Sequence, residues 1–240
     1  YGEGTPRNYQ KSFEYFELSA KKGYSYAMKM LGEHYRYPLG RPKDLDKALF
    51  WYTKAAKYGN RDANSMIGQM YLDGQMKNIG PKKALAAIRK SADLEGNNGI
   101  FLLAKVYEEG LCGVEKNLDK ALSLYNKIAR FQSGKNGWSS YPPAVKKLAW
   151  LYQGNNGAPL DAAKAIQWLD FQGDDKAYFQ IGQLYDYGKG IKQNHQLAFE
   201  NYLKSAKLGN KHAAHKVAQC YEKGIGVEKN RKEAERWKGK

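Results

Sequence analysis

Three side chains near the end of the chain are of the types that bind zinc. His212 and His215 stand three residues apart on a predicted helix, and Cys220 follows them. A zinc site needs three or four ligands in compatible geometry, and the other histidines, His34 and His195, belong to other copies of the repeat described below. We therefore predict no metal site, no cofactor and exposed imidazoles at positions 212 and 215.

Two pairs of adjacent carboxylates, Glu108–Glu109 and Asp174–Asp175, could in principle supply acid–base chemistry. Neighbouring residues on a helix point in different directions, so neither pair forms an acid–base couple. The sequence also contains no phosphate-binding loop and no nucleophile motif with its partner residues. We predict that the protein is not an enzyme.

Pairs of short helices must position these side chains. The segment from Asp175 to Gly209 carries one stripe of small and apolar residues at helical spacing, then a Gly-rich turn, then a second stripe. Neither helix can bury its stripe alone, whereas copies of the unit on both sides close it. Such copies recur every 33–36 residues, with one step of 45. The sequence therefore predicts an all-α fold of stacked helix–turn–helix repeats without a β-sheet.

The first helix of each repeat ends in a Tyr that follows a small residue by three positions. A small residue lets a neighbouring helix approach closely, and the Tyr ring fills the groove beside it. The pairs are Gly32/Tyr35, Gly68/Tyr71, Ala104/Tyr107, Ala149/Tyr152, Gly182/Tyr185 and Ala218/Tyr221.

The second helix opens on an Asn or Asp, whose side-chain oxygen can accept from free N–H groups of the first turn. These N-caps are Asn8, Asp44, Asn117, Asp161, Asn194 and Asn230, with Gly80 as the exception. We expect Tyr15, Tyr52, Tyr125 and Tyr202 to share one core position on this helix, and Trp51, Trp168 and Trp237 to pack beside it. Most second helices should stop at a glycine, namely Gly23, Gly59, Gly96, Gly173 and Gly209.

These repeats make residues 1–240 a single array. We place a leading half-repeat at 1–23 and full repeats at about 25–59, 61–96, 97–130, 142–173, 175–209 and 211–238. Residues 131–142 are an insertion that is either functional or a tolerated surface loop. Cys112 and Cys220 lie three repeats apart, so we expect two free thiols.

The chain has 40 Lys and Arg against 24 Asp and Glu, a formal charge of +16. Such a balance indicates either a solvated basic exterior or a face that binds an acidic partner. Nucleic acid is the less favoured partner, because the Tyr rings are accounted for by packing and Lys greatly outnumbers Arg. We expect a monomer whose partner is another protein with an acidic surface, and no membrane span.

These residues resemble the Sel1-like repeat, a relative of the tetratricopeptide repeat. The resemblance rests on A-x4-G-x2-Y, then G-x-G, then N-x3-A, then WY-x-KAA-x-x-G, as in Ala27–Gly59 and Ala177–Gly209. It covers nearly the whole chain apart from residues 131–142. It implies a right-handed α-solenoid, a bacterial source in the cell envelope or a secreted setting, and a role in holding other proteins in a concave groove lined by the first helices.

If the helices pack as in tetratricopeptide repeats, two positions of each first helix face that groove. Three large rings then occupy places that the fold does not require to be apolar, and truncation of such an anchor typically weakens binding by ~2 kcal/mol or more. The alternative is that the rings pack against the preceding second helix. The predicted protein-binding residues are Phe101, Trp150, Phe179, Lys105, Lys146, Lys176, Gln183 and Tyr187.

Two functions fit these expectations. One is a non-enzymatic scaffold or adaptor that holds a partner protein in the groove. The other is an inhibitor or immunity protein that clamps and neutralises a toxin or hydrolase. Glycan binding is a weaker third reading.

Overall fold

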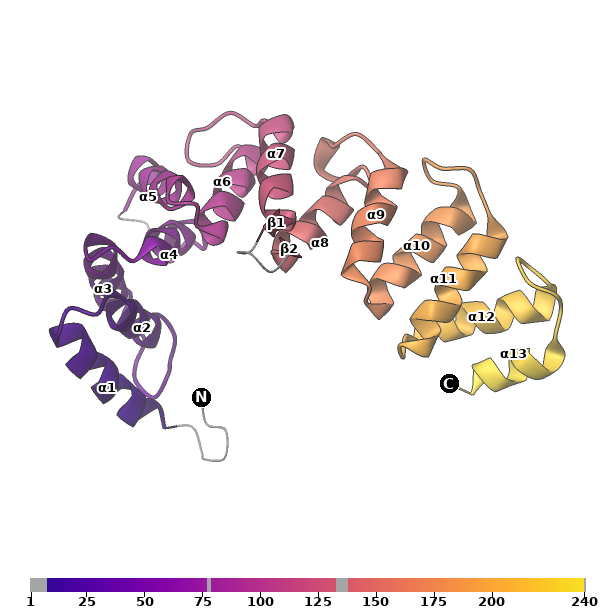
Figure 1. Cartoon of the computed structure of the whole chain (residues 1–240), viewed down its shortest axis with the longest axis horizontal. Coiled ribbons are helices and arrows are strands. Elements are labelled where there is room, and N and C mark those ends of the chain that lie inside the picture. The colour runs from indigo at the N-terminus through magenta and orange to yellow at the C-terminus, as the bar shows by residue number, and fades with distance from the viewer. Residues whose placement is uncertain (1–7, 77–78, 133–137, 240) are drawn as a thin grey trace. The chain divides into compact units, whose positions relative to one another are not determined.

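The computed structural model of the protein describes residues 8–76, 79–132 and 138–239. These residues form thirteen α-helices, one 3-10 turn and one pair of very short strands (Figure 1). The helices are α1 (Tyr9–Lys21), α2 (Ser25–Arg36), α3 (Leu45–Lys57), α4 (Arg61–Leu72), α5 (Pro81–Asp93), α6 (Asn97–Glu109), α7 (Leu118–Ala129), α8 (Pro142–Leu151), α9 (Ala162–Gln172), α10 (Asp175–Tyr187), α11 (His195–Lys207), α12 (Lys211–Lys223) and α13 (Arg231–Lys238). The 3-10 turn η2 is Asn155–Gly157.

The helices alternate between two roles. The even-numbered helices α2 to α12 are the first helices of the repeats, and the odd-numbered helices are the second helices. The predicted all-α class of stacked helix–turn–helix repeats is therefore confirmed. The chain divides into two compact units, an N-terminal unit of Tyr1–Leu124 and a C-terminal unit of Tyr125–Lys240, and the division falls within α7. Within the N-terminal unit, α1, α3 and α5 form one row and α2, α4 and α6 the other (Figure 1).

The predicted N-caps are confirmed. Each of the six Asn or Asp side chains accepts a hydrogen bond from the backbone N–H three residues later, as Asn194 does from Leu197 at 3.0 Å. Three first helices are capped by the same kind of hydrogen bond, with Asn60, Asp174 and Asn210 as N-caps. Local capping therefore defines where most helices of the repeat begin.

One predicted helix stop is wrong. Gly23, Gly59, Gly173 and Gly209 have positive φ, where glycine avoids the steric cost of a side chain. Gly96, however, is the N-cap of α6 with φ of −71°, and Glu95 takes the left-handed conformation instead. The turn after α5 is thus displaced by one residue relative to the predicted alignment.

The core forms where a first helix meets the ring of the following second helix. A Cβ atom on Gly182 would lie 2.5 Å from Cδ1 of Tyr202, and Gly32 and Gly68 meet Tyr52 and Ile88 in the same way. Three of the four predicted core tyrosines, at positions 52, 125 and 202, are buried. The prediction for Tyr15 is wrong: it is 69% exposed, because the equivalent position eight residues after the N-cap is Phe16. The predicted packing of Trp51, Trp168 and Trp237 is confirmed, since all three are buried or half-buried.

The insertion contains the one departure from an all-helical chain among the described residues. Strands β1 (Phe131–Gln132) and β2 (Trp138–Ser139) pair in antiparallel fashion, which corrects the expectation of no β-sheet. A strand pair of two residues each leaves the repeats on either side unchanged. Cys112 and Cys220 are both free thiols, as predicted.

A buried histidine joins the first two helices. His34 on α2 is 2% exposed and lies edge-on against the rings of Tyr9, Phe13 and Phe16 on α1. Burial, more than the nearby Arg41 guanidinium, lowers the pKa of His34 below its ordinary 6.5. The folded N-terminal unit therefore favours the neutral imidazole.

We predict that Gly182→Leu destabilises the C-terminal unit by ~1–3 kcal/mol, because the added side chain would overlap the Tyr202 ring. Thermal unfolding followed by circular dichroism measures the effect. Lys176→Leu adds the same side chain at an exposed position of the same helix and should leave the melting temperature nearly unchanged. Equal melting temperatures for wild type and Gly182→Leu would contradict the packing described for this position.

We also predict that acid weakens the N-terminal unit through His34. The unfolded chain gains a proton at this residue as pH falls below its ordinary 6.5, whereas the folded chain does so only at a lower pH, so the free energy of unfolding decreases across that interval. Urea unfolding at about pH 7.5 and about pH 5.5 should show a larger loss for wild type than for His34→Gln. An identical loss in both proteins would assign the pH dependence to other groups.

Candidate functional site

The candidate site is the first-helix face of the C-terminal unit, formed by side chains of α8, α10 and α12 that do not pack into the core. Four helical positions recur on two or three of these helices, so the side chains form one strip across successive repeats. The strip consists of Lys146, Lys147, Trp150, Lys176, Gln180, Gln183, Tyr187, His212, His215, Lys216 and Gln219, all exposed or half-buried.

Amide side chains tie the first two helices of this face together. Gln153, just beyond the end of α8, donates from Nε2 to Oε1 of Gln180 on α10 at 3.1 Å. The Lys189 ammonium donates to the backbone carbonyl of Gln153 at 3.1 Å. Gln153, which follows the C-cap of α8, therefore joins the end of α8 to α10 on this face.

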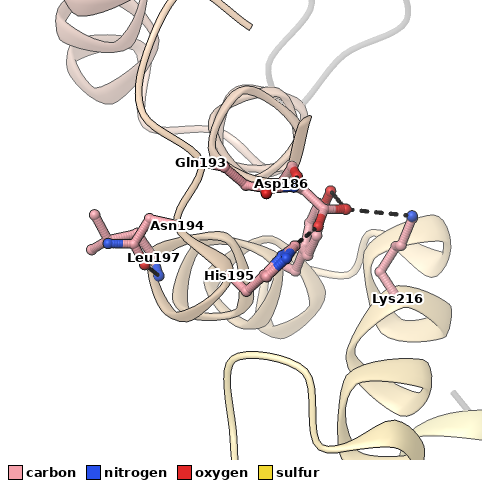
Figure 2. Close-up of polar contacts among 7 residues, drawn as sticks. Asp186, Gln193, Asn194, His195, Leu197 and Lys216 are labelled. Atoms are coloured by element: carbon pink, nitrogen blue, oxygen red, sulfur yellow. Dashed lines mark hydrogen bonds and ion pairs between the residues drawn. The ribbon is translucent and has the colours of Figure 1, made fainter. Parts of the chain in front are cut away.

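Asp186 ties α10 to the next two helices (Figure 2). Its Oδ1 lies 3.2 Å from Nδ1 of His195, and its Oδ2 accepts from the Tyr202 hydroxyl at 3.1 Å and lies 3.7 Å from Nζ of Lys216 on α12. The Asp186 backbone carbonyl also accepts from Gln193 at 2.7 Å, next to the Asn194 cap (Figure 2). One carboxylate thus fixes the entry to α11 and the position of Lys216.

The electrostatics around Asp186 do not favour covalent chemistry. Burial, reinforced by the Asp186 carboxylate, raises the pKa of the Tyr202 hydroxyl, so this group stays a hydrogen-bond donor. Burial likewise raises the pKa of the Cys220 thiol, and the same carboxylate adds to the effect. A thiol held in its protonated form is a poor nucleophile and a poor metal ligand.

Two exposed aromatic rings on this face each have a lysine beside them. Trp150 is 42% exposed, with Nζ of Lys147 at 4.8 Å from its ring centroid. Tyr187 is 65% exposed, with Nζ of Lys216 at 5.8 Å. These distances are within the range of cation–π attraction, so each lysine is held close to its ring.

The other predicted binding residues differ in exposure. Lys146 and Lys176 are exposed and Gln183 is half-buried. Phe179 is half-buried, with its ring centroid 5.5 Å from that of Tyr202 and 6.4 Å from that of His212. It therefore packs against the second helix of its own repeat rather than the preceding one. Part of its surface is committed to the core of the C-terminal unit.

Phe101 and Lys105 lie on α6 in the N-terminal unit, and both are half-buried. The remaining predicted binding residues all lie in the C-terminal unit. That the eight residues share one groove stays a prediction.

The sequence reasoning missed the residue that follows the repeat Tyr. At this position Arg36 on α2 is 2% exposed and donates to Asp73 at 2.8 Å and to Gln75 at 2.9 Å. Gln153 and Asp186 make the cross-repeat contacts described above from the same position. A charged or amide side chain recurring next to a core Tyr is the signal that could have identified these links.

Cations outnumber acids on the three helices of this face. The cations are Lys146, Lys147, Lys176, Lys211, Lys216 and Lys223, and the acids are Asp175, Asp186 and Glu222. All three acids already have partners: Asp175 accepts from Asn210, Asp186 is the hub described above, and Glu222 pairs with Lys238 at 2.6 Å. The charge left for a partner is positive.

Across the part of the chain that the structure describes, no three His, Cys, Asp or Glu side chains gather as a metal site. His212 and His215 are exposed, as predicted, and His215 is hydrogen-bonded to Gln219 at 2.9 Å. The described helices include none that is both long and apolar enough to cross a bilayer.

Comparison with protein families gives a match along almost the whole chain. The Sel1 repeat model matches residues 1–24, 25–60, 61–94, 98–130, 142–170, 175–210 and 211–237. A comparison with curated proteins finds no match.

Solved structures give the same fold. A protective antigen of uropathogenic Escherichia coli with an SLR fold is 29% identical with a TM-score of 0.68, and the match covers 98% of this chain and 49% of that one. This chain thus spans about half the length of the antigen. A Sel1 repeat protein from Oxalobacter formigenes is 26% identical with a TM-score of 0.66, and the match covers 98% of this chain and 67% of that one.

We predict that removing the Asp186 carboxylate loosens the link between α10, α11 and α12. A hydrogen bond to a charged group contributes about 1.5–3 kcal/mol, so Asp186→Ala should lower the free energy of unfolding by an amount in this range. Tyr202→Phe keeps the ring against Gly182 and removes only one of the bonds, so it should cost less. Urea unfolding of the three proteins tests this order, and a costlier Tyr202→Phe would contradict it.

Proposed function

The chain belongs to the Sel1 repeat family, and we propose that it is a non-enzymatic scaffold that holds a partner protein on the first-helix face of its C-terminal unit. Sel1 repeats generally mediate interactions between proteins and are generally non-catalytic.

The observation that supports this surface is the exposure of Trp150 and Tyr187. The repeat buries its rings at defined core positions, and neither residue occupies one of them. Large exposed aromatic side chains are enriched at the centres of protein interfaces, where they supply much of the binding free energy. Both sit on helices that direct polar contacts hold in place, so little ordering is needed on binding.

The partner should present carboxylates. The acids of this face are already paired, whereas Lys146, Lys176 and Lys211 are exposed and form no ion pair within the described residues. Excess positive charge around aromatic anchors accelerates association with an acidic surface and makes it sensitive to salt. Phe179 is better regarded as a packing residue with one exposed edge, because its ring contacts Tyr202.

The test uses matched pairs of exposed rings. Trp150→Ala/Tyr187→Ala removes two rings that are 42% and 65% exposed, and the control Phe171→Ala/Tyr15→Ala removes two that are 43% and 69% exposed on second helices. A partner is first captured from the source cell with the wild-type chain and then purified. We expect the first variant to bind this partner at least about 30-fold more weakly, since the loss of even one anchor costs ~2 kcal/mol and 1.4 kcal/mol is tenfold.

The control variant should bind within about threefold of wild type, and both should keep the wild-type circular dichroism spectrum. Equal affinity for wild type and Trp150→Ala/Tyr187→Ala would place the partner on another surface. A captured enzyme that loses its activity on binding would make the chain an inhibitor rather than a scaffold.

A further inference from the structure

A second charged surface lies in the N-terminal unit, on the side of the second helices. We propose that the outward faces of α3 and α5, here called the α3–α5 face, dock on an anionic lipid bilayer. The proposal is independent of the partner surface in the C-terminal unit.

The cations of this face lie on the second helices of two successive repeats, and both helices carry Lys three and ten residues after the N-cap. Lys82, Lys83, Arg89 and Lys90 follow the α5 N-cap by two, three, nine and ten residues, and all four are exposed. On α3, Lys47, Lys54 and Lys57 follow the Asp44 cap by three, ten and thirteen residues. Equivalent positions in successive repeats face the same way, which aligns the four lysines that stand three and ten residues after the N-caps. The other three cations, Lys57, Lys82 and Arg89, are exposed and neighbour them around each helix, so the seven cations lie on one side of the two helices. In Figure 1, α3 and α5 lie in one row and α2 and α4 in the other.

The charge on α5 is not neutralised locally. Within the described residues, Lys82, Lys83, Arg89 and Lys90 form no ion pair, whereas Lys47 pairs with Asp44 at 3.0 Å. The other acids on the two helices are Asp46 and Asp93. The four cations of α5 are therefore available to an anionic partner.

An apolar side chain stands among these cations. Phe50 on α3 is 58% exposed, and with Leu49 and Thr53 it lines a depression of about 450 Å³ that Asp46, Lys54 and Lys57 also line. Lys54 lies with Nζ at 5.9 Å from the Phe50 ring centroid. An exposed ring beside lysines is suited to the interfacial layer of a bilayer, where it can enter the headgroup region while the lysines contact phosphate.

The composition favours a bilayer over other anionic partners. Protein interfaces are depleted in Lys and enriched in aromatic residues and Arg, yet α5 has three lysines, one arginine and no aromatic residue. Single-stranded nucleic acid is bound by stacking on successive aromatic rings, whereas Phe50 is the exposed ring that helix α3 contributes and helix α5 adds none. A cluster of flexible lysines spread over two helices is the pattern that anionic headgroups attract, at roughly fivefold in affinity per cation.

The test is sedimentation of the whole chain with vesicles of phosphatidylcholine alone or with about 30 mol% phosphatidylserine, at about 0.1 M salt. We expect binding only to the anionic vesicles. The variant Lys82→Gln/Lys83→Gln/Arg89→Gln/Lys90→Gln should bind at least about tenfold more weakly. The control Lys192→Gln/Lys207→Gln/Lys229→Gln/Lys232→Gln removes the same charge from exposed sites of the C-terminal unit and should lose less than about threefold.

Phe50→Ser should weaken vesicle binding further at salt concentrations that screen the lysines, with an unchanged circular dichroism spectrum. Equal losses in the two charge variants would show diffuse attraction to a basic protein and would overturn the proposal. So would tighter, equally variant-sensitive binding to poly-glutamate, which would indicate an acidic protein, or to a single-stranded oligonucleotide, which would indicate nucleic acid.

Discussion

The contact on which the repeats depend is the close approach of a first helix to the following second helix. It uses a small residue, Gly or Ala, on the first helix. Where that residue is Gly, a large side chain lies directly against it, as Tyr52 does at Gly32 and Tyr202 at Gly182. The distance between the glycine backbone and the ring leaves no room for a Cβ atom. The space between the two helices is therefore packed as densely as a protein interior. Because each such contact involves only one repeat, stability is distributed along the chain rather than concentrated in a central core.

Close packing at the small residue also brings the end of each first helix near the first helix of the next repeat. A long polar side chain on the residue after the repeat Tyr can therefore contact that next helix. Arg36 reaches Asp73 in this way, and Asp186 reaches Lys216. An ionic contact that is half-shielded from water is stronger than a pair on an open surface, yet it depends on geometry that the small-residue contact has already set. Packing therefore fixes the distance between repeats, and the polar links fix which side chains face outward.

Most of the fold could be predicted from the sequence because its signals are local and repeated. Each signal acts within a few residues: an Asn before a helix, a glycine after it, and a small residue three positions before a Tyr. Aligning the repeats then shows which residue of each copy occupies a given position. The errors came where one copy departs from the others: Gly96 serves as an N-cap because Glu95 adopts the left-handed turn, and Tyr15 is one residue away from the core position that Phe16 fills. The polar residue that recurs after the repeat Tyr marks the position of Asp186 in the sequence. Its partners His195 and Lys216 could not be predicted, because only the packing of three helices brings them to it.

The distribution of charge shows why the net charge alone could not identify a binding surface. The first helices of the N-terminal unit carry equal numbers of cations and acids: Lys29, Arg36, Arg61 and Lys105 against Glu33, Asp62, Glu108 and Glu109. The excess there resides on the second helices α3 and α5, whereas in the C-terminal unit α8 and α12 also contribute. The first-helix face of the C-terminal unit and the α3–α5 face of the N-terminal unit therefore both carry positive charge. They differ in the exposed rings beside the lysines, which are Trp150 and Tyr187 on the first and Phe50 on the second. Since charge attracts without discriminating, the aromatic residues beside the lysines decide which kind of partner each surface can hold.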